Sequence, residues 1–264
     1  MTIIYDMSNA DYHSHEALSK SGTDDLDKSP MHFKARREKP REETPAMAIG
    51  TAVHTLTLEP ETFFDRYVVA PAGIDRRTTA GKTAWAEIEG SGKIVLKHED
   101  FQQIESMASA VRAHPVTEAL FDEGRAEVSF FSTLSGVDVK CRPDWFREDG
   151  IIVDLKTTED ASPGGFSSSV AKFNYHKQAA FYSDILSDIG FDVAAFVFIA
   201  VEKSYPYAVG IYELDLDAID LGRQAYLANL ETYRECMKSG IWPGYSTNVE
   251  VLNLPRWKYL QQAA

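Results

Sequence analysis

The spacing of apolar side chains predicts helices near both ends of the chain and a group of strands in its middle. Between Ala46 and Leu58 the apolar residues are spaced to share one buried face of a helix. Short runs rich in Val, Ile and Phe follow later, which is typical of strands. Helices are predicted over residues 46–58, 99–113, 171–186 and 217–238, and strands over 125–133, 137–146, 151–156, 193–201 and 207–214. This order predicts a single α/β domain over residues 1–264, with helices flanking one mixed sheet.

Two other segments have less regular patterns. Ser21 and Thr23 indicate the start of a short basic helix, and prolines interrupt the segment that follows. Residues 71–92, which contain four glycines, are predicted to form a loop. Within this loop Gly81-Lys82-Thr83 is similar to the end of a phosphate-binding P-loop, but that motif needs a glycine where Arg76 stands. Nucleotide hydrolysis by a P-loop is therefore not expected.

The charge of the chain is strongly acidic but uneven. The 264 residues carry a net charge of −13, which by itself argues against nucleic-acid binding. Residues 28–41 are the exception, because they hold six Lys or Arg residues and one Glu. A polyanion can still be bound by such a stripe if the acidic residues lie elsewhere or bind metal. No apolar run is long enough for a membrane span, no signal peptide is evident, and a cytoplasmic location is expected.

Asp144, Asp154 and Lys156 form the strongest chemical pattern. Asp154 and Lys156 are two positions apart on a predicted strand and therefore share a face, whereas Leu155 points into the core. A three-residue hairpin loop ending at Gly150 would place Asp144 directly opposite Asp154. A two-residue loop would put the two aspartates on opposite faces. We adopt the first register because it alone makes a site.

Paired carboxylates repel one another across a sheet, unless a divalent cation lies between them. Such a cation can polarise a phosphate and lower the pKa of water, and Lys156 could orient that water. The plainer interpretation is a surface Asp–Lys pair, since this short pattern often occurs by chance. Glu127 is a third possible ligand or a solvated strand residue. His54 is either a core histidine or a contact to metal or phosphate, and Gln178 and Tyr182 share one face of a predicted helix.

Taken in chain order, these residues give the chain a resemblance to the RecB-like branch of the PDDEXK nucleases. The amino-acid sequence is most similar to the nuclease domain of RecE-type exonucleases (exonuclease VIII), over roughly residues 10–245. The stretches that carry the resemblance are LSKSGTDDLDKSPMHFK, AIGTAVHTLTLEPE, TTAGKTAWAE, VKCRPDW, IIVDLKTTEDASP and YHKQAAFYSDIL. The two cysteines, Cys141 and Cys236, exclude the four-cysteine iron–sulfur cluster of a related branch.

The resemblance implies a PDDEXK fold and a Mg²⁺-dependent exonuclease, for which Mn²⁺ could substitute. It implies degradation of one strand of linear duplex DNA from its 5′ end, which leaves 3′ tails for recombination and repair, as in prophage-encoded systems. It also implies a ring of three or four subunits and a single-strand annealing recombinase as partner. The implied metal-binding residues are Asp144, Asp154, Leu155, His54 and Glu127. The implied catalytic residues are Lys156 together with Asp144, Asp154, His54 and Glu127. The predicted DNA contacts are Ser21, Arg36, Arg37, Arg142, Gln178 and Tyr182.

A ring would also reconcile the acidic chain with a DNA substrate, because basic residues could face its channel while acids face outward. The candidates for the channel are Lys34, Arg36, Arg37, Lys39, Arg41, Arg76, Arg77 and Lys82. Solubility of a basic helix would explain the same charges. Two other functions stay open: an endonuclease of the same fold, and a non-catalytic module that binds DNA ends.

Overall fold

A mixed five-stranded sheet forms the centre of the protein. The structure is a computed structural model and describes residues 1–39, 44–73 and 77–255. Strands β8 and β9 run parallel, and every other neighbouring pair in the sheet is antiparallel. This arrangement confirms the predicted α/β fold with a central mixed sheet. The strand order is β10 (Val209–Glu213), β9 (Ala195–Glu202), β8 (Ile151–Thr158), β7 (Trp145–Arg147) and β4 (Gly124–Ala126).

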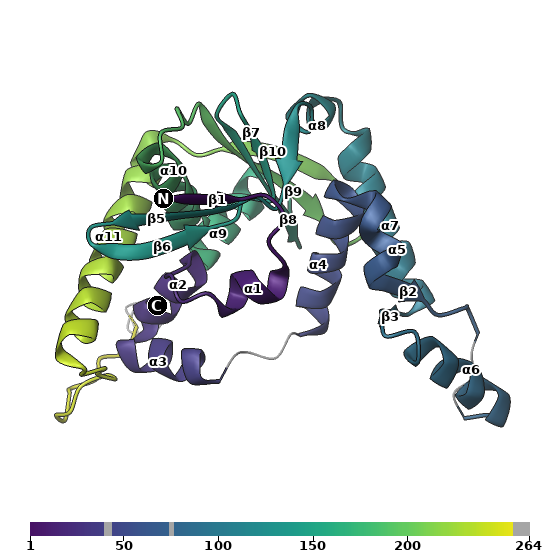
Figure 1. Cartoon of the computed structure of the whole chain (residues 1–264), viewed down its shortest axis with the longest axis horizontal. Coiled ribbons are helices and arrows are strands. Elements are labelled where there is room, and N and C mark those ends of the chain that lie inside the picture. The colour runs from purple at the N-terminus through teal and green to yellow at the C-terminus, as the bar shows by residue number, and fades with distance from the viewer. Residues whose placement is uncertain (40–43, 74–76, 256–264) are drawn as a thin grey trace, which may run out of the picture.

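Helices cover both faces of this sheet because its central strands are apolar on both sides (Figure 1). On β8, Ile152 packs into the core beneath α9, α10 and α11, whereas Val153 and Leu155 pack into a second core beneath α4 and α7. Asp154 and Lys156 therefore face the α10 side. The covering helices are α9 (Pro163–Phe173), α10 (Tyr175–Asp188) and α11 (Leu216–Ser239) on one face, and α4 (Pro45–Leu58) and α7 (His98–Ala113) on the other.

Two smaller sheets correct the expectation of a single sheet. The segment predicted as one strand over 125–133 is broken at Glu127, whose φ of 54° turns the chain from β4 into β5. The segment predicted as one strand over 137–146 is likewise broken, and its halves belong to different sheets. These smaller sheets are β1 (Thr2–Ile4), β5 (Ser129–Leu134) and β6 (Val137–Cys141), and the parallel pair β2 (Tyr67–Val69) and β3 (Ile94–Leu96).

The helical predictions need three corrections. Residues 71–92 were expected to be a loop, but α6 (Thr79–Glu89) forms there, with the side chain of Thr78 capping its first turn. The predicted helix over 171–186 is split by Asn174, which adopts a left-handed conformation between α9 and α10. The basic segment forms two helices, because Ser29 ends the first and caps the second. They are α2 (Lys20–Lys28), capped by Ser19 rather than Ser21, and α3 (Pro30–Glu38).

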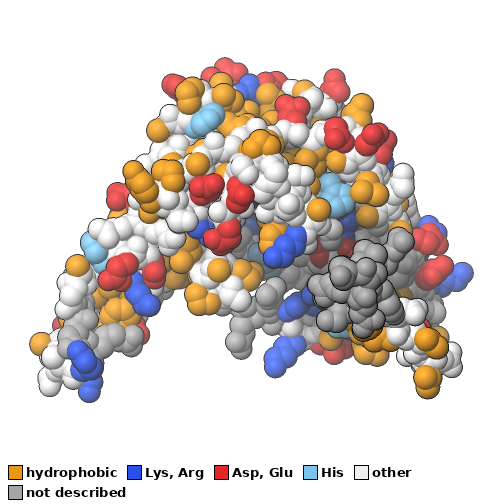
Figure 2. Space-filling view, turned by 180° about the vertical axis from the view of Figure 1, so that it is seen from behind, with side chains coloured by type: hydrophobic (Ala, Val, Ile, Leu, Met, Phe, Trp, Pro, Cys, Tyr) orange, Lys and Arg blue, Asp and Glu red, His pale blue; other side chains and the backbone are white. Residues whose placement is uncertain are grey.

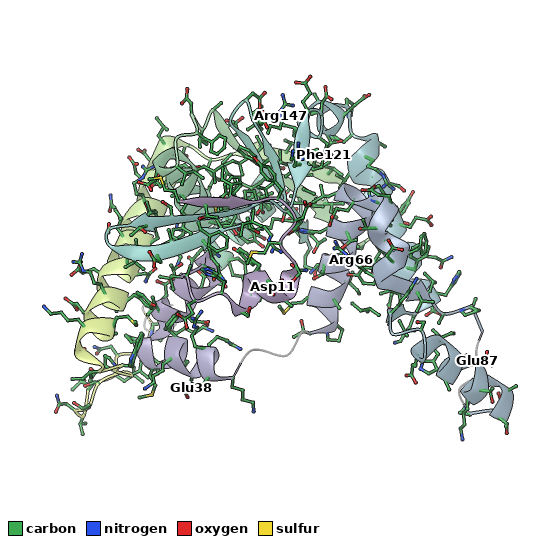
Figure 3. All side chains as sticks on the ribbon, viewed as in Figure 1. Asp11, Glu38, Arg66, Glu87, Phe121 and Arg147 are labelled. Atoms are coloured by element: carbon green, nitrogen blue, oxygen red, sulfur yellow. The ribbon has the colours of Figure 1, made fainter. Side chains whose placement is uncertain are left out.

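The whole chain has the outline of an arch (Figure 1). One limb contains α3 and the end of α11, and the other contains β2, β3 and α6. Glu38 and Glu87 mark the lower parts of the two limbs, and Asp11 lies between them (Figure 3). In the described residues no helix is both long and apolar enough to cross a membrane. The remaining helices are α1 (Asn9–Ser14), η1 (Pro60–Thr62), α5 (Phe63–Arg66) and α8 (Pro115–Leu120).

Gly150 fixes the hairpin that joins β7 to β8. Its φ is +88°, and a Cβ atom there would lie 2.0 Å from the backbone oxygen of Asp192. Gly150→Ala should therefore lower the free energy of unfolding by about 3 kcal/mol, through backbone strain and overpacking together. Gly136 is the matched control, because its φ is +76° and nothing lies within 4 Å of its Cβ position. Gly136→Ala should cost about 1 kcal/mol, and equal losses in urea unfolding would contradict this account.

Candidate functional site

The residues predicted to form a site come from four different elements. His54 lies on α4, Glu127 at the turn between β4 and β5, and Asp144 just before β7. Asp154 and Lys156 lie on β8. The turn at Glu127 and the segment before β7 lie side by side, because the Glu127 N–H donates to the Asp144 carbonyl over 3.2 Å. The site therefore forms where β5 and β6 pass from the smaller sheet into the central one.

Asp144 is held against β8 by the register of the hairpin. Trp145 pairs with Val153 and Phe146 with Ile152, so continuing the register places Asp144 opposite Asp154. This confirms the register predicted with the three-residue loop. The carboxylate of Asp144 also accepts a hydrogen bond of 2.6 Å from the Leu155 N–H.

His54, Glu127 and Asp144 form the cluster best suited to a metal ion. Each offers one ligand atom, and these three atoms lie within 4.8 Å of one another. Nδ1 of His54 lies 3.3 Å from the Asp144 carboxylate. Carboxylate oxygens suit Mg²⁺ and Mn²⁺, while an imidazole nitrogen is more typical of transition metals. The donor set therefore fits a divalent cation, although Asp154, which the resemblance implies as a metal ligand, is not one of the three.

Asp154 lies beside this cluster but is bound to different partners. One of its oxygens forms an ion pair with the Lys156 ammonium, and the other accepts a hydrogen bond of 2.5 Å from the Gln178 amide. Asp154 is 1% exposed, so these contacts replace the water that a carboxylate would otherwise need. The Leu155 N–H points toward Asp144, and the carbonyl of a strand residue points to the same side as its N–H. The Leu155 carbonyl is thus directed toward the cluster.

Burial and close charges shift the pKa values of the acids in opposite directions. Burial and the nearby Asp144 raise the pKa of Glu127 to about 7. Burial raises the pKa of Asp154 to about 6, although Lys156 opposes that shift. Burial acts in the same direction on Asp144, but His54, Lys156 and the Leu155 N–H outweigh it and lower its pKa. Asp144 is thus the carboxylate that stays ionised to the lowest pH.

Nearby acids raise the pKa values of the two basic groups of the site. Burial lowers the pKa of Lys156, but Asp154 and Asp144 outweigh it and the net shift is upward. Burial likewise lowers the pKa of His54, and Asp144 reverses the sign. The Lys156 ammonium also lies 4.8 Å from the ring centre of Tyr175, within the range of a cation–π contact.

Metal binding should weaken as the pH falls from about 8 to about 6, because Glu127, with a pKa of about 7, and His54, whose pKa is raised, must release protons before they can act as ligands. Below the pKa of Glu127 the apparent affinity should fall by about tenfold per pH unit for each proton released. Calorimetric titration with Mn²⁺ at several pH values measures this slope. Glu127→Gln should remove the step near pH 7. An unchanged slope in that variant would exclude Glu127 from the metal site.

The structure places the predicted DNA contacts at different depths. Gln178 is buried against Asp154 and supports the site directly. Tyr182 packs against the core beside Phe181 and Phe196. Ser21 is exposed near the start of α2, where its hydroxyl lies 2.9 Å from that of Ser19.

Arg142 does not fit the DNA contact predicted for it, because its guanidinium group is buried and fully engaged within the protein. It donates to Asn9 and Ser129 side chains at 2.6 and 2.9 Å and to backbone oxygens of residues 7 and 8. It also lies over the ring of Tyr12 and 3.7 Å from the Glu127 carboxylate. Arg142 thus fastens the N-terminal segment to the turn that carries Glu127.

The basic residues predicted to line a channel are only partly grouped. Arg36 forms an ion pair with Asp25 at 3.6 Å, and Arg37 donates to the backbone oxygen of Glu16 at 3.2 Å. Lys34 and Lys39 are exposed on the same limb, and Arg77 and Lys82 lie on the other limb. On one face, acids gather along the upper edge while several Lys and Arg side chains lie toward the lower middle (Figure 2). Arg41 and Arg76 lie outside the described residues.

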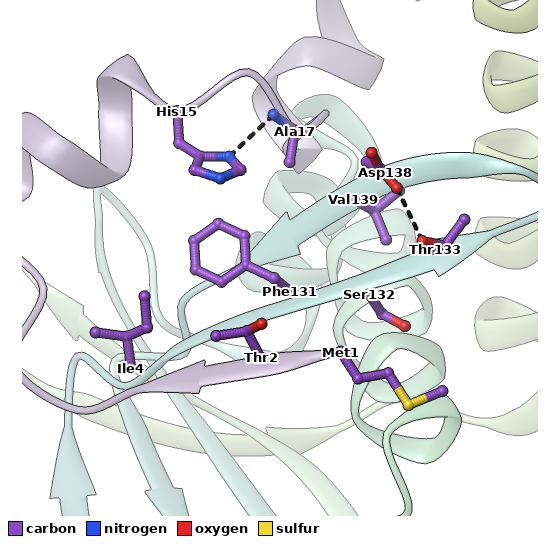
Figure 4. A pocket seen from close by; sticks show the side chains of 10 residues that line it. All are labelled: Met1, Thr2, Ile4, His15, Ala17, Phe131, Ser132, Thr133, Asp138 and Val139. Carbon is purple, nitrogen blue, oxygen red and sulfur yellow. Dashed lines mark hydrogen bonds between the residues drawn. The ribbon is translucent and has the colours of Figure 1, made fainter.

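A separate pocket of about 190 Å³ lies beside β1 and β5 and shares no residue with the site (Figure 4). His15 and Phe131 line one side of it, and its one carboxylate, Asp138, accepts a hydrogen bond from Thr133. With a single acid, this pocket lacks the ligand set found at His54, Glu127 and Asp144.

Comparison with known proteins identifies the family to which this chain belongs. The chain belongs to the family described as "PDDEXK-like domain of unknown function (DUF3799)", which matches residues 19–255. No curated protein matches the sequence. The PDDEXK superfamily inferred from the sequence is thus confirmed, and the narrower RecE type stays a prediction.

Solved structures support the same fold. A crystal structure described as "Putative exonuclease" from Eubacterium rectale aligns with 95% of this chain and 96% of its own, with a TM-score of 0.67 and 16% identity. That similarity shows the shared fold. The structure of SSO0001 aligns with 78% of this chain and 98% of its own at 13% identity, but its TM-score of 0.30 is too low to indicate a common fold. Family and fold together point to a nuclease.

Proposed function

We propose that this protein is a metal-dependent exonuclease that degrades one strand of linear duplex DNA in the 5′-to-3′ direction. The observation that carries the proposal is that a cluster of possible metal ligands lies next to a buried Asp–Lys ion pair. A ligand set of His54, Glu127 and Asp144 lies beside the Asp154–Lys156 pair, and the Leu155 N–H ties the two together. Paired acids, a histidine and a lysine gathered at the central strand β8 are more than DNA binding alone requires.

The residues of the site would divide the chemistry between them. His54, Glu127 and Asp144 would hold Mg²⁺ or Mn²⁺, together with the carbonyl of Leu155. The bound cation would supply Lewis-acid polarisation of the scissile phosphate and make water more acidic. The Lys156 ammonium would orient the attacking water and offset negative charge on the phosphate. Asp154 and Gln178 would hold Lys156 in place, since Asp154 contacts both.

The choice of an exonuclease rests on the resemblance to RecE-type enzymes, and the description of the Eubacterium rectale protein agrees with it. The direct test uses linear duplexes labelled at either the 5′ or the 3′ end, and a closed circle of the same sequence. With Mg²⁺ the 5′ label should be released first and the 3′ strand should persist. The circle should stay intact, and EDTA should stop all hydrolysis.

Two other outcomes identify the alternatives. Cleavage of the closed circle would make the protein an endonuclease of the same fold. Tight binding of linear ends without hydrolysis, with either Mg²⁺ or Mn²⁺, would make it a DNA-end-binding module. Release of the 3′ label first would reverse the proposed polarity.

We also propose that the working form is a ring of three or four subunits in the cytoplasm, which supplies single-stranded 3′ tails to an annealing recombinase in DNA recombination and repair. The charge of −13 supports a ring, because an isolated acidic subunit would repel DNA while a ring can turn its basic limbs inward. Light scattering at working concentration tests the subunit number, and a monomer would contradict the ring.

Reversing Arg36 and Arg37 to Glu should weaken DNA binding and flatten its dependence on salt, because fewer counterions are released. Turnover should recover in part at high DNA concentration, since neither residue belongs to the metal cluster. The double variant Arg125→Glu, Arg147→Glu is the control, because it changes the net charge equally on the opposite edge of the molecule, where Arg147 is labelled in Figure 3. Equal salt slopes for wild type and both variants would exclude α3 from the DNA path.

A further inference from the structure

An exposed aromatic ring is separated from the Asp154–Lys156 pair by a single tyrosine ring. Phe173, the last residue of α9, is 48% exposed, although burying such a side chain would be favourable. Its ring stacks on that of Tyr175, with 5.6 Å between ring centres and 29° between planes. The left-handed Asn174 between them reverses the chain and brings the two rings together.

Tyr175 links this exposed ring to the lysine of the site. The Lys156 ammonium lies 4.8 Å from the centre of the Tyr175 ring, so one ring separates Phe173 from Lys156. The inner side of the stack continues into the core, where Tyr175 packs on Phe198. The stack is therefore anchored at one end and open to solvent at the other.

Two lysines lie near the stack, Lys172 at its exposed end and Lys20 beside Tyr175. Lys172 lies 5.2 Å from the Phe173 ring centre. The Lys20 ammonium lies 5.9 Å from the Tyr175 ring, donates to the Phe173 backbone oxygen at 2.7 Å and pairs with Asp24 at 2.8 Å. An aromatic platform with lysines around it is the arrangement by which proteins hold single-stranded nucleic acid, with bases stacked on rings and phosphates near cations.

We propose that Phe173 is a stacking platform for the base of an unpaired nucleotide in the strand bound at Lys156. A base inside a duplex is already stacked on both faces, whereas the base of an unpaired nucleotide has its faces free for this ring. The inference rests on the proposed nuclease function and adds a substrate requirement to it. The strand to be cut must be separated from its complement near the site.

The test measures binding and KM for duplexes with a short unpaired 5′ tail, in which a single abasic position is moved along the tail. Phe173→Leu, which keeps an apolar side chain but removes the ring, should weaken binding of the intact tail roughly 5- to 100-fold. For one position of the abasic site, Phe173→Leu and wild type should bind the tail equally, because the base that would stack on Phe173 is already missing. Phe173→Trp should retain wild-type binding.

Phe64→Leu is the matched control, because Phe64 is 56% exposed but lies on α5, away from β8. Phe173→Leu should unfold within a few degrees of wild type, since about half of the side chain is already in solvent and leucine keeps an apolar contact with Tyr175. The proposal is overturned if Phe173→Leu binds as tightly as Phe64→Leu, or if its loss is the same at every abasic position. If Phe173→Leu binds the tail more weakly as predicted but wild type does not hydrolyse DNA, the nuclease function is contradicted. The role of Phe173 in stacking a base is then still supported.

Discussion

Asp144→Asn and Asp154→Asn should each reduce DNA hydrolysis by at least about 10³-fold, because each removes a charge from the ligand set or from its immediate support. Asp144 is the stronger case, since it belongs to the cluster with His54 and Glu127 and keeps the lowest pKa of the three acids. Asparagine has the same shape and its amide oxygen can still accept from the Leu155 N–H. Asp144→Asn should therefore fold normally.

Asp154→Asn should be less stable than Asp144→Asn. Asp154 is nearly fully buried and pairs with the Lys156 ammonium, so a neutral side chain leaves Lys156 without its closest counter-charge. Urea unfolding would separate this loss of stability from the loss of activity. Calorimetric titration with Mn²⁺ should show the larger loss of affinity in Asp144→Asn.

Glu159→Gln is the control for both variants, because it also removes one negative charge directly after β8, but at a side chain that is 80% exposed. It should retain wild-type hydrolysis and Mn²⁺ affinity. Full activity in Asp144→Asn would refute the assignment of the metal site, whatever the outcome at Asp154.

The sequence predicted the part of this site that depends on strand geometry. The alternation along β8 places Asp154 and Lys156 on one face and Leu155 in the core, and the three-residue loop sets the position of Asp144. The three-residue loop was preferred to a two-residue loop because it alone makes a site, whereas the alternation is a local rule that needs no knowledge of the rest of the fold. The prediction of the long helices α4, α7 and α11 succeeded for the same reason, since their apolar periodicity is local.

The features of the site that were not predicted depend on contacts between residues far apart in the sequence, or on turns that break a local pattern. Glu127 reaches the site because a left-handed turn at this residue leads the chain from one sheet into another. The alternation of side chains instead predicts one continuous strand across this turn. Arg142 is buried by the N-terminal segment, which is more than 130 residues away in the chain. Tyr175 was missed, although it lies three positions before Gln178 and so shares its helical face. That spacing was the available signal.

Lys156→Ala and Lys156→Arg should both lower turnover by at least about 10²-fold while DNA-end binding changes little. The Lys156 side chain is 17% exposed and its ammonium lies between Asp154 and the Tyr175 ring. A planar guanidinium is larger and presents its donors in a fixed fork, so it cannot replace a compact ammonium that orients water. Wild-type turnover in Lys156→Arg would reduce Lys156 to a general positive charge.

The pH profile distinguishes a role in orienting water from a role in holding Asp154 ionised. Lys156 opposes the upward shift that brings the pKa of Asp154 to about 6. Lys156→Ala removes that opposition, so the pKa of Asp154 should rise and the residual activity should require a higher pH. Lys156→Arg keeps the charge, so its acid limb should stay near that of wild type at a much lower maximum. If raising the pH restores Lys156→Ala to wild-type turnover, Lys156 acts only through Asp154. If its maximum stays low at every pH, the ammonium itself takes part in the reaction.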